Sequence, residues 1–303
     1  MSDDSLLSIL AALAANLTIA VAKGVAAALT GSAALFAETL HTLADAGNEV
    51  LLWIAVRRSA RPADASHPLG YGPERYYWAL IAAAGMFVVG GVAAIYEGVQ
   101  ALIDPPKLDA FWAGVTVLVI ALVLDGSSRV VAMRTLRAQA ARTGTTVRAL
   151  LRDSPDPTVT TIYFEDTIDV LGAALALIAL ILHRVLGWEW PDAIASLIIG
   201  GLLAFMAMRL AGRNRALLTN EAVAPVIAER LRARLLAQDG IVEIVRMESV
   251  YLGPREALVA ADVIVDCGDV PATLERVREE VKRQTPFITR LYLTPVRNVR
   301  GES

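Results

Sequence analysis

The sequence predicts an integral membrane protein of two parts: an all-α bundle of six transmembrane helices over residues 1–215, and a small α/β domain over 216–303. The first observation is composition, because the 303 residues are 55% hydrophobic and only 19% charged, with a mean hydropathy of +0.52. Average globular chains carry about 25% charged residues. The second is that apolar residues collect in runs of about 20, the length that crosses a hydrocarbon core of roughly 30 Å. The third is that hydropathy falls after about residue 216.

Six membrane-length segments precede that change. They lie near 7–29, 32–56, 76–102, 110–133, 159–182 and 192–211. The first is too long for a signal peptide and shows no small-residue cleavage site, so we expect it to remain as a span. Only Thr30-Gly31-Ser32 separates the first two spans, which predicts a tight helical hairpin. Pro105-Pro106 ends the third span sharply.

The basic residues predict the orientation of the bundle. Most arginines before residue 216 lie in the 57–75 and 129–157 connections and at the end of the sixth span, whereas the opposite loops hold only Lys107 and Arg184. By the positive-inside rule, both termini are expected in the cytoplasm. The preference for arginine over lysine suits a bacterial inner membrane, which is the location we expect.

The pattern after residue 216 predicts a cytoplasmic domain of helices and strands. The expected elements are a helix over 221–237, strands over 241–251 and 257–266, a helix over 270–284 and a strand near 288–296. Gly240 ends the first helix, Gly253-Pro254 suits a hairpin, and Asp269 is an N-cap candidate for the second helix. This α-β-β-α-β order suggests a small ferredoxin-like fold.

Ionisable side chains inside membrane spans are costly, so each one marks a candidate functional residue. The second span contains Glu38, His41, Asp45 and Glu49, and the fifth contains Glu165, Asp166 and Asp169. His41 and Asp45 are four residues apart on one helix face, and they provide half of a tetrahedral site for a divalent transition metal, zinc above all. Glu165 and Asp169 share a face at the same spacing. We therefore predict a metal site made of His41, Asp45, Glu165, Asp166 and Asp169, whose groups take up protons when the metal leaves.

Other interpretations of the polar residues stay open. The histidine of the second span can hydrogen-bond within the bundle instead, and Glu38 or Glu49 can be interfacial. Asp125 in the fourth span is either a carboxylate of the ion or proton pathway, or a partner of Lys23 or a nearby arginine. Asn16 in the first span is expected to make an interhelical hydrogen bond.

Three stretches, taken together, resemble the cation diffusion facilitators, the zinc and manganese exporters of bacteria and eukaryotes. They are TGSAALFAETLHTLADAGNEVLL (30–52), HPLGYGPERYYWAL (67–80) and PDAIAS (191–196). The resemblance implies a homodimeric transporter that exchanges a cytoplasmic divalent cation for protons by alternating access. It also implies two ligands from the second helix, which His41 and Asp45 match, and two from the fifth.

The fifth-helix motif departs from that of the zinc members, which usually carry His-x-x-x-Asp. This sequence offers Ile162-x-x-x-Asp166 or Glu165-x-x-x-Asp169, similar to a divergent branch in which a Glu-Asp pair opens the motif. A site of one nitrogen and two or three oxygens keeps Zn²⁺ first as cargo, with Mn²⁺, Fe²⁺ and Co²⁺ as alternatives. No resident cofactor is expected, because the metal is the transported ion.

Two further regions differ from many members of that family. In some members the 57–75 loop holds a second metal site of an aspartate and two histidines. Here Asp64 and His67 remain, but Tyr71 stands where a second histidine is expected, so the loop is either a metal site or a structural turn. The tail lacks the zinc-binding histidines of many members, and we expect it to dimerise without a high-affinity metal cluster.

The leading hypothesis is a proton-coupled divalent-cation antiporter in the lipid bilayer. The alternative is a membrane metal sensor or scaffold that no longer transports, which the atypical fifth-helix motif allows. An intramembrane metal enzyme is disfavoured, because the sequence contains no His-Glu-x-x-His pattern. The formal net charge of −3 gives no reason to expect nucleic acid as a partner.

Overall fold

The computed structural model describes residues 3–143, 146–148, 157–254 and 256–297, and it divides into two compact units. The first unit consists of Met1–Ala55 and Trp78–Asn214, and the second of Val56–Tyr77 and Arg215–Ser303. Residues 144–145 and 149–156 of the predicted 129–157 connection, among them Arg152, lie outside the described residues. Each unit is described by itself below.

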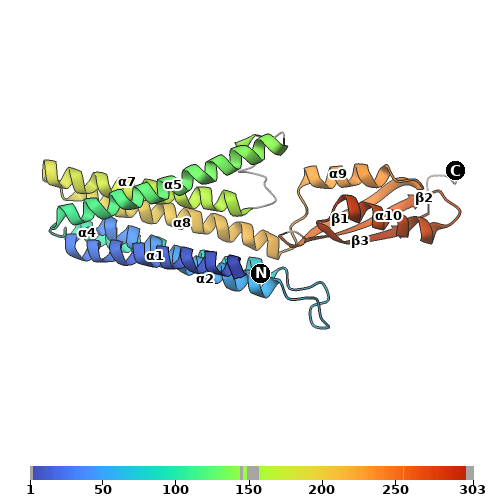
Figure 1. The fold of residues 1–303 in the computed structure, drawn as a ribbon, viewed down its shortest axis with the longest axis horizontal. Coiled ribbons are helices and arrows are strands. Elements are labelled where there is room, and N and C mark those ends of the chain that lie inside the picture. The colour runs from blue at the N-terminus through green and yellow to red at the C-terminus, as the bar shows by residue number, and fades with distance from the viewer. Residues whose placement is uncertain (1–2, 144–145, 149–156, 255, 298–303) are drawn as a thin grey trace. The chain divides into compact units, whose positions relative to one another are not determined.

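Long helices form the frame of the first unit (Figure 1). Six helical rods occur in the described part of the chain: α1 (Asp3–Thr30), α2 (Ala33–Ser59), a third rod of α3 (Glu74–Gly85), η1 (Met86–Val92) and α4 (Ala93–Ile103), then α5 (Phe111–Thr143), α7 (Pro157–Leu186) and α8 (Trp190–Leu218). Each predicted span coincides with one rod. The helices α5 and α8 continue beyond the predicted ends, because their polar last turns are rich in Ala, Arg and Leu, which are good helix formers.

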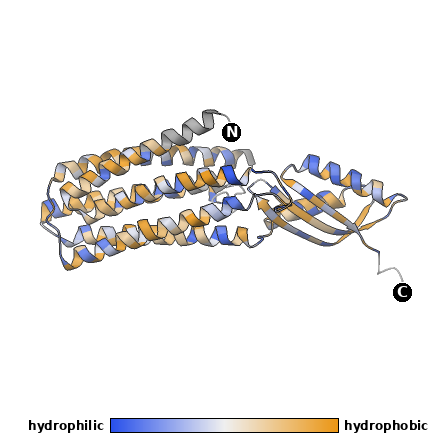
Figure 2. Cartoon of the chain, turned by 90° about the horizontal axis from the view of Figure 1, so that it is seen from below, coloured by the Kyte–Doolittle hydropathy of each residue, from blue (hydrophilic) through white to orange (hydrophobic). Residues whose placement is uncertain are grey.

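The hydropathy of the rods agrees with a membrane bundle. Four of the described rods are long and apolar enough to cross a membrane, and they cover 74–103, 111–141, 163–186 and 190–218. Residues 16–30 of α1 form a shorter apolar helix, while the ionisable residues of α2 lower its hydropathy. Hydrophobic residues predominate along the bundle helices in Figure 2. Large apolar side chains such as Val21, Trp112 and Val123 are exposed, as expected for a surface in contact with lipid.

The third rod contains a π-helical segment, Met86–Val92, that the sequence analysis did not predict. Two glycines bring this rod and α8 together backbone to backbone. A Cβ at Gly91 would lie 3.0 Å from the Cβ of Ala204, and one at Gly200 would lie 2.8 Å from the amide nitrogen of Ile95. Such small residues let membrane helices approach closely, where van der Waals packing holds them together.

The N-terminus of α2 is capped from another helix. Ser32 Oγ accepts a hydrogen bond from the Leu35 amide (3.0 Å) and donates one to Asp192 Oδ1 (2.5 Å). Asp192 Oδ2 in turn accepts from the Ala33 amide at 2.6 Å. A buried carboxylate of α8 therefore satisfies the free N–H groups of α2 and complements its positive helix end. This cap fixes where α2 begins.

The second unit contains a three-stranded sheet. Its elements are α9 (Pro225–Leu236), β1 (Ile241–Gly253), β2 (Glu256–Val265), α10 (Val270–Gln284) and β3 (Ile288–Pro295). The strand order is β1-β2-β3, with β1 and β2 antiparallel and β2 and β3 parallel. Asp269 caps α10 by accepting from the Ala272 amide at 3.1 Å, as predicted. Apolar residues of α9 and α10, among them Leu235 and Val277, pack with the strands into one buried core. The predicted fold class, a membrane helix bundle with a small α/β domain, is confirmed.

The segment 56–77 packs within the second unit beside the β1–β2 hairpin. A Cβ at Gly72 would lie 2.0 Å from the carbonyl oxygen of Leu252, so no residue with a side chain fits there without a backbone shift. Arg290 of β3 donates to the carbonyl oxygen of Pro68 at 3.4 Å. The connection between α2 and α3 is thus anchored on the sheet.

Candidate metal centre

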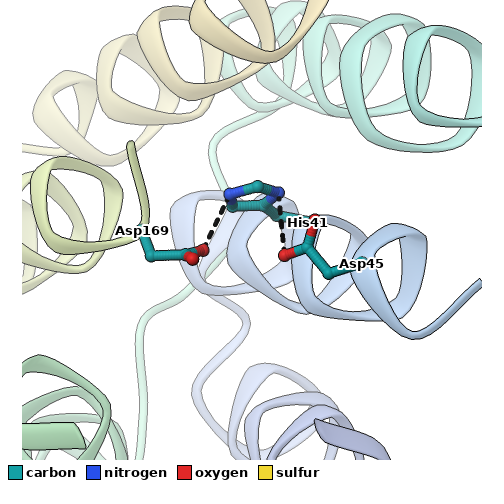
Figure 3. A group of neighbouring side chains, drawn as sticks. All are labelled: His41, Asp45 and Asp169. Carbon is teal, nitrogen blue, oxygen red and sulfur yellow. Dashed lines mark ion pairs between the residues drawn. The ribbon is translucent and has the colours of Figure 1, made fainter. Parts of the chain in front are cut away.

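Three of the predicted ligands meet inside the helix bundle. His41 and Asp45 come from α2 and Asp169 comes from α7, and one ligand atom from each lies within 4.8 Å of the others. Figure 3 shows the imidazole of His41 between the two carboxylates. Its Nε2 is 2.7 Å from Asp169 Oδ1, and its Nδ1 is 3.5 Å from Asp45 Oδ2. The structure therefore brings together two ionisable side chains from α2 and one from α7, two rods far apart in the sequence.

The local sequence explains this arrangement. The spacing of four residues places His41 and Asp45 one above the other on α2, and His41 is only 1% exposed. Among the described residues, neither ring nitrogen of His41 nor Asp45 Oδ1 makes a hydrogen bond of good geometry, although all three atoms are buried. Buried polar atoms usually have such a partner. A cation held between the three side chains would satisfy them.

The separations suit a small divalent cation. Zinc binds imidazole nitrogen at about 2.0–2.1 Å and carboxylate oxygen at about 2.0–2.2 Å, so two ligand atoms of one tetrahedral ion are about 3.5 Å apart. The ligand atoms of the three side chains lie within 4.8 Å of one another, so they would have to close in by about 1 Å around the ion. Three protein ligands also leave one position of a tetrahedral ion open.

The other two predicted ligands lie outside this cluster. Glu165 Oε1 accepts a hydrogen bond from Asn48 Nδ2 at 3.3 Å, one helical turn before Asp169 on α7. Asp166 turns toward α5 instead, where Ser128 Oγ donates to its Oδ2 at 2.8 Å. The side chain of Ile162, which opens the other possible fifth-helix motif, lies outside the described residues. The Glu165–Asp169 pair is thus the one that faces α2.

The flanking polar residues of α2 both pair with α1. Glu38 is fully buried, and its Oε2 lies 3.0 Å from the Nζ of Lys23. An interfacial position for Glu38 is therefore wrong, because a buried lysine neutralises it. Glu49 Oε1 accepts from Asn16 Nδ2 at 2.8 Å, which confirms the predicted interhelical hydrogen bond of Asn16.

The pairing of Lys23 with Asp125, one of the open alternatives, is not found. Lys23 donates to Glu38 and to Thr42, and no hydrogen bond or ion pair joins Asp125 to a lysine or arginine in the described ranges. The sequence analysis also missed Asn48. Asn48 follows Asp45 by three residues, so helical periodicity places it on the same face of α2 and could have identified it.

The loop between α2 and α3 is a hydrogen-bonded turn. Asp64 Oδ2 accepts from the Tyr71 hydroxyl at 2.8 Å, and its Oδ1 accepts from the amides of Ser66 and His67, both at 2.9 Å. These hydrogen bonds hold the pKa of the Asp64 carboxyl below its ordinary value. The ring of His67 stacks on Tyr71 with centroids 4.1 Å apart. Of the two alternatives for this loop, the contacts favour the structural turn.

Comparison with known proteins supports a transport protein. The family model for the cation efflux transmembrane domain matches residues 9–219. The chain is 31% identical over 237 residues to the proton-coupled zinc antiporter SLC30A9, mitochondrial, of Mus musculus, covering 78% of this chain and 42% of that protein. It is 32% identical over 238 residues to metal tolerance protein C4 of Arabidopsis thaliana, covering 77% of this chain and 51% of that protein. It is 30% identical over 213 residues to the cation-efflux pump FieF of Shewanella oneidensis, covering 70% of this chain and 66% of that protein. The chain spans about half the length of the first two relatives.

Proposed function

The chain belongs to the cation efflux family, and on that premise we propose that it exports a divalent metal cation, Zn²⁺ first, from the cytoplasm in exchange for protons. The observation that carries the proposal is the meeting of His41, Asp45 and Asp169 inside the bundle. Because the ligands come from two rods, the affinity of the site for the cation changes when α2 and α7 move relative to each other. Alternating access requires such a difference in affinity between two states. The relatives named as a zinc antiporter and a cation-efflux pump support this proposal.

Competition between protons and the cation at the same atoms would couple their movements. Each ring nitrogen of His41 faces a carboxylate. The imidazole can carry two protons and interact with both carboxylates, or it can lose one proton and bind the ion through the freed lone pair. Because one lone pair holds either a proton or a metal, binding of the cation releases protons and protonation expels it.

The donor set supports Zn²⁺ and leaves room for harder ions. One imidazole nitrogen and two carboxylate oxygens bind first-row divalent metals, with affinity rising from Mn²⁺ through Fe²⁺ and Co²⁺. We assign Glu165 as the fourth ligand, reached by a rotation that releases Asn48. Asp166 hydrogen-bonds to α5 and receives no direct bond to the ion in this proposal.

The test is transport by the full chain in proteoliposomes loaded with a fluorescent Zn²⁺ indicator, with and without an imposed pH gradient. We expect gradient-driven Zn²⁺ uptake that is lost in His41→Ala. The matched control is His183→Ala, since His183 lies at the exposed end of α7 with its Nδ1 3.0 Å from the carbonyl oxygen of Trp188. Wild-type uptake by His41→Ala would contradict the site. Tight Zn²⁺ binding without uptake would favour the alternative hypothesis, a membrane metal sensor or scaffold that does not transport.

The family resemblance and the arginine distribution carry two further parts of the proposal. We infer that two copies assemble through the 216–303 domain, and that both termini face the cytoplasm of a bacterial inner membrane. Light scattering of the detergent-solubilised chain tests the first part. A monomer at all accessible concentrations would refute it.

A further inference from the structure

A buried lysine sits beside the cation site, and the proposed transport mechanism does not use it. Lys23 of α1 is only 1% exposed, and Glu38 of α2 is fully buried. The Lys23 ammonium donates to Glu38 Oε2 at 3.0 Å and to Thr42 Oγ1 at 2.9 Å. Two oxygen atoms of α2 therefore surround a positive charge that α1 supplies.

The stability of the fold does not by itself explain why a buried Lys23–Glu38 ion pair is present. Charged side chains within a membrane are expensive, and a buried ion pair is often no better for stability than apolar residues of the same volume. Glu38 lies three residues before His41, about 4.5 Å along the helix axis toward the α1–α2 turn. That end of the bundle is the one the arginine distribution predicts to face away from the cytoplasm.

The second oxygen of Glu38 is unused. Among the residues that the structure describes, no hydrogen bond reaches Glu38 Oε1, although this atom is buried. It faces α7 at Gly172, where a Cβ would lie 1.9 Å from it. Gly172 follows Asp169 by three residues, so the free oxygen lies against the same helix that supplies a ligand to the cation site. The lysine therefore satisfies only one of the two carboxylate oxygens of Glu38.

We propose that the Lys23 ammonium is a tethered substitute for the transported cation: it occupies a second cation position, made by Glu38 and Thr42, through which the ion passes after leaving His41, Asp45 and Asp169. The inference rests on the proposed function. The departing ion displaces the ammonium from the two oxygens. When the ion has left, the ammonium returns on its tether, neutralises Glu38 and prevents the ion from binding there again.

Charge accounts for the effect of the tether. A dication and an ammonium repel each other strongly in a medium of low dielectric constant, so they cannot share Glu38. Without the ammonium, the buried carboxylate would hold the ion and slow its release. Without the carboxylate, the ammonium would stay uncompensated beside the cation site and weaken binding there. The two removals therefore act in opposite directions, whereas the loss of a merely structural contact acts in one.

The experiment measures Zn²⁺ binding by equilibrium dialysis and Zn²⁺ flux in proteoliposomes, on the full chain. Lys23→Met should bind one further Zn²⁺ per chain and transport about tenfold more slowly, while Glu38→Gln should bind Zn²⁺ about tenfold more weakly. The double variant should bind close to the wild type. Lys107→Met, which removes an exposed lysine, is the matched control.

Weaker binding in both single variants, or wild-type binding in both, would overturn the inference. If Lys23→Met is not recovered as folded protein, Glu38→Gln and the double variant decide. Weak Zn²⁺ binding by Glu38→Gln, together with nearly wild-type binding by the double variant, supports the role of Lys23 as a tethered cation. Any other result refutes it. A wild type that neither binds nor transports Zn²⁺ would overturn the proposed function and this inference with it, whereas failure of the variants alone leaves the proposed function intact.

Discussion

Asp192 holds the N-terminus of α2 in place, and its exchange for asparagine should destabilise the bundle by about 2.5–5 kcal/mol. The carboxylate accepts from the Ser32 hydroxyl with one oxygen and from the Ala33 amide with the other, at 2.5 and 2.6 Å. An asparagine has one acceptor oxygen, so one of the two hydrogen bonds is lost.

The magnitude follows from two contributions. A hydrogen bond to a charged group contributes roughly 1.5–3 kcal/mol net. A negative charge at a helix N-terminus contributes about 0.3–1 kcal/mol, and up to about 2 kcal/mol where it is partly buried. Asp192 is only 2% exposed, which puts its charge in the upper part of that range. The sum is the expected loss.

Thermal unfolding of the full chain in detergent, followed by circular dichroism, measures the effect. For a domain of this size the expected loss corresponds to a drop in Tm of about 5–10 °C. Asp104→Asn is the matched control, because Asp104 is an exposed aspartate just after α4. A Tm for Asp192→Asn within about 1 °C of the wild type would refute the assignment of Asp192 as the cap of α2.

Three further predictions concern the site and the 56–77 segment. Asp169→Asn should weaken Zn²⁺ binding, measured by calorimetry, by about tenfold or more, while Asp166→Asn should change it little, because Asp169 alone of the two approaches His41. Gly72→Ala puts a methyl group 2.0 Å from a carbonyl oxygen of β1, so hydrogen exchange of the 56–77 segment should accelerate while the sheet stays protected. Hydrogen bonds lower the pKa of Asp64, so the turn that it organises should persist as pH falls past the ordinary aspartate pKa and should be lost only at the lowered pKa. Asp64→Asn should open the turn even at neutral pH.

Each of these has a contradicting outcome. Equal losses of Zn²⁺ affinity in the two aspartate variants would mean that the cluster is assigned to the wrong face of α7. Unchanged exchange in Gly72→Ala would show that the segment is not anchored through that contact. A turn that opens at the ordinary aspartate pKa, or that stays closed in Asp64→Asn, would remove Asp64 as its organiser.

Element positions were predictable because their causes are local. Long apolar runs fix the rods, Asp269 marks the start of α10, and alternating β-branched residues mark β1 and β2. The π-helical segment Met86–Val92 was not predictable, because its glycines and apolar residues are equally compatible with an α-helix. Its geometry depends on close packing against α8, which is a tertiary effect.

The sequence identified the candidate ligands of the site but not which of them contact one another. Periodicity alone puts Glu165, Asp166 and Asp169 on neighbouring faces of α7. Which carboxylate meets His41 depends on how α7 is rotated, and there Ser128 of α5 engages Asp166. The partner of Lys23 was likewise undetermined, since several carboxylates lie at similar depth and only the packing of α1 on α2 selects Glu38.

The central claim is that His41, Asp45 and Asp169 bind the transported ion together, and X-ray absorption at the zinc edge tests it most directly. The full chain loaded with one equivalent of Zn²⁺ should show nitrogen and oxygen ligands at about 2.0–2.2 Å with scattering from one imidazole. His41→Ala at equal Zn²⁺ occupancy should lose the imidazole signal. A wild-type spectrum without imidazole scattering, or an identical spectrum from His41→Ala, would contradict the claim.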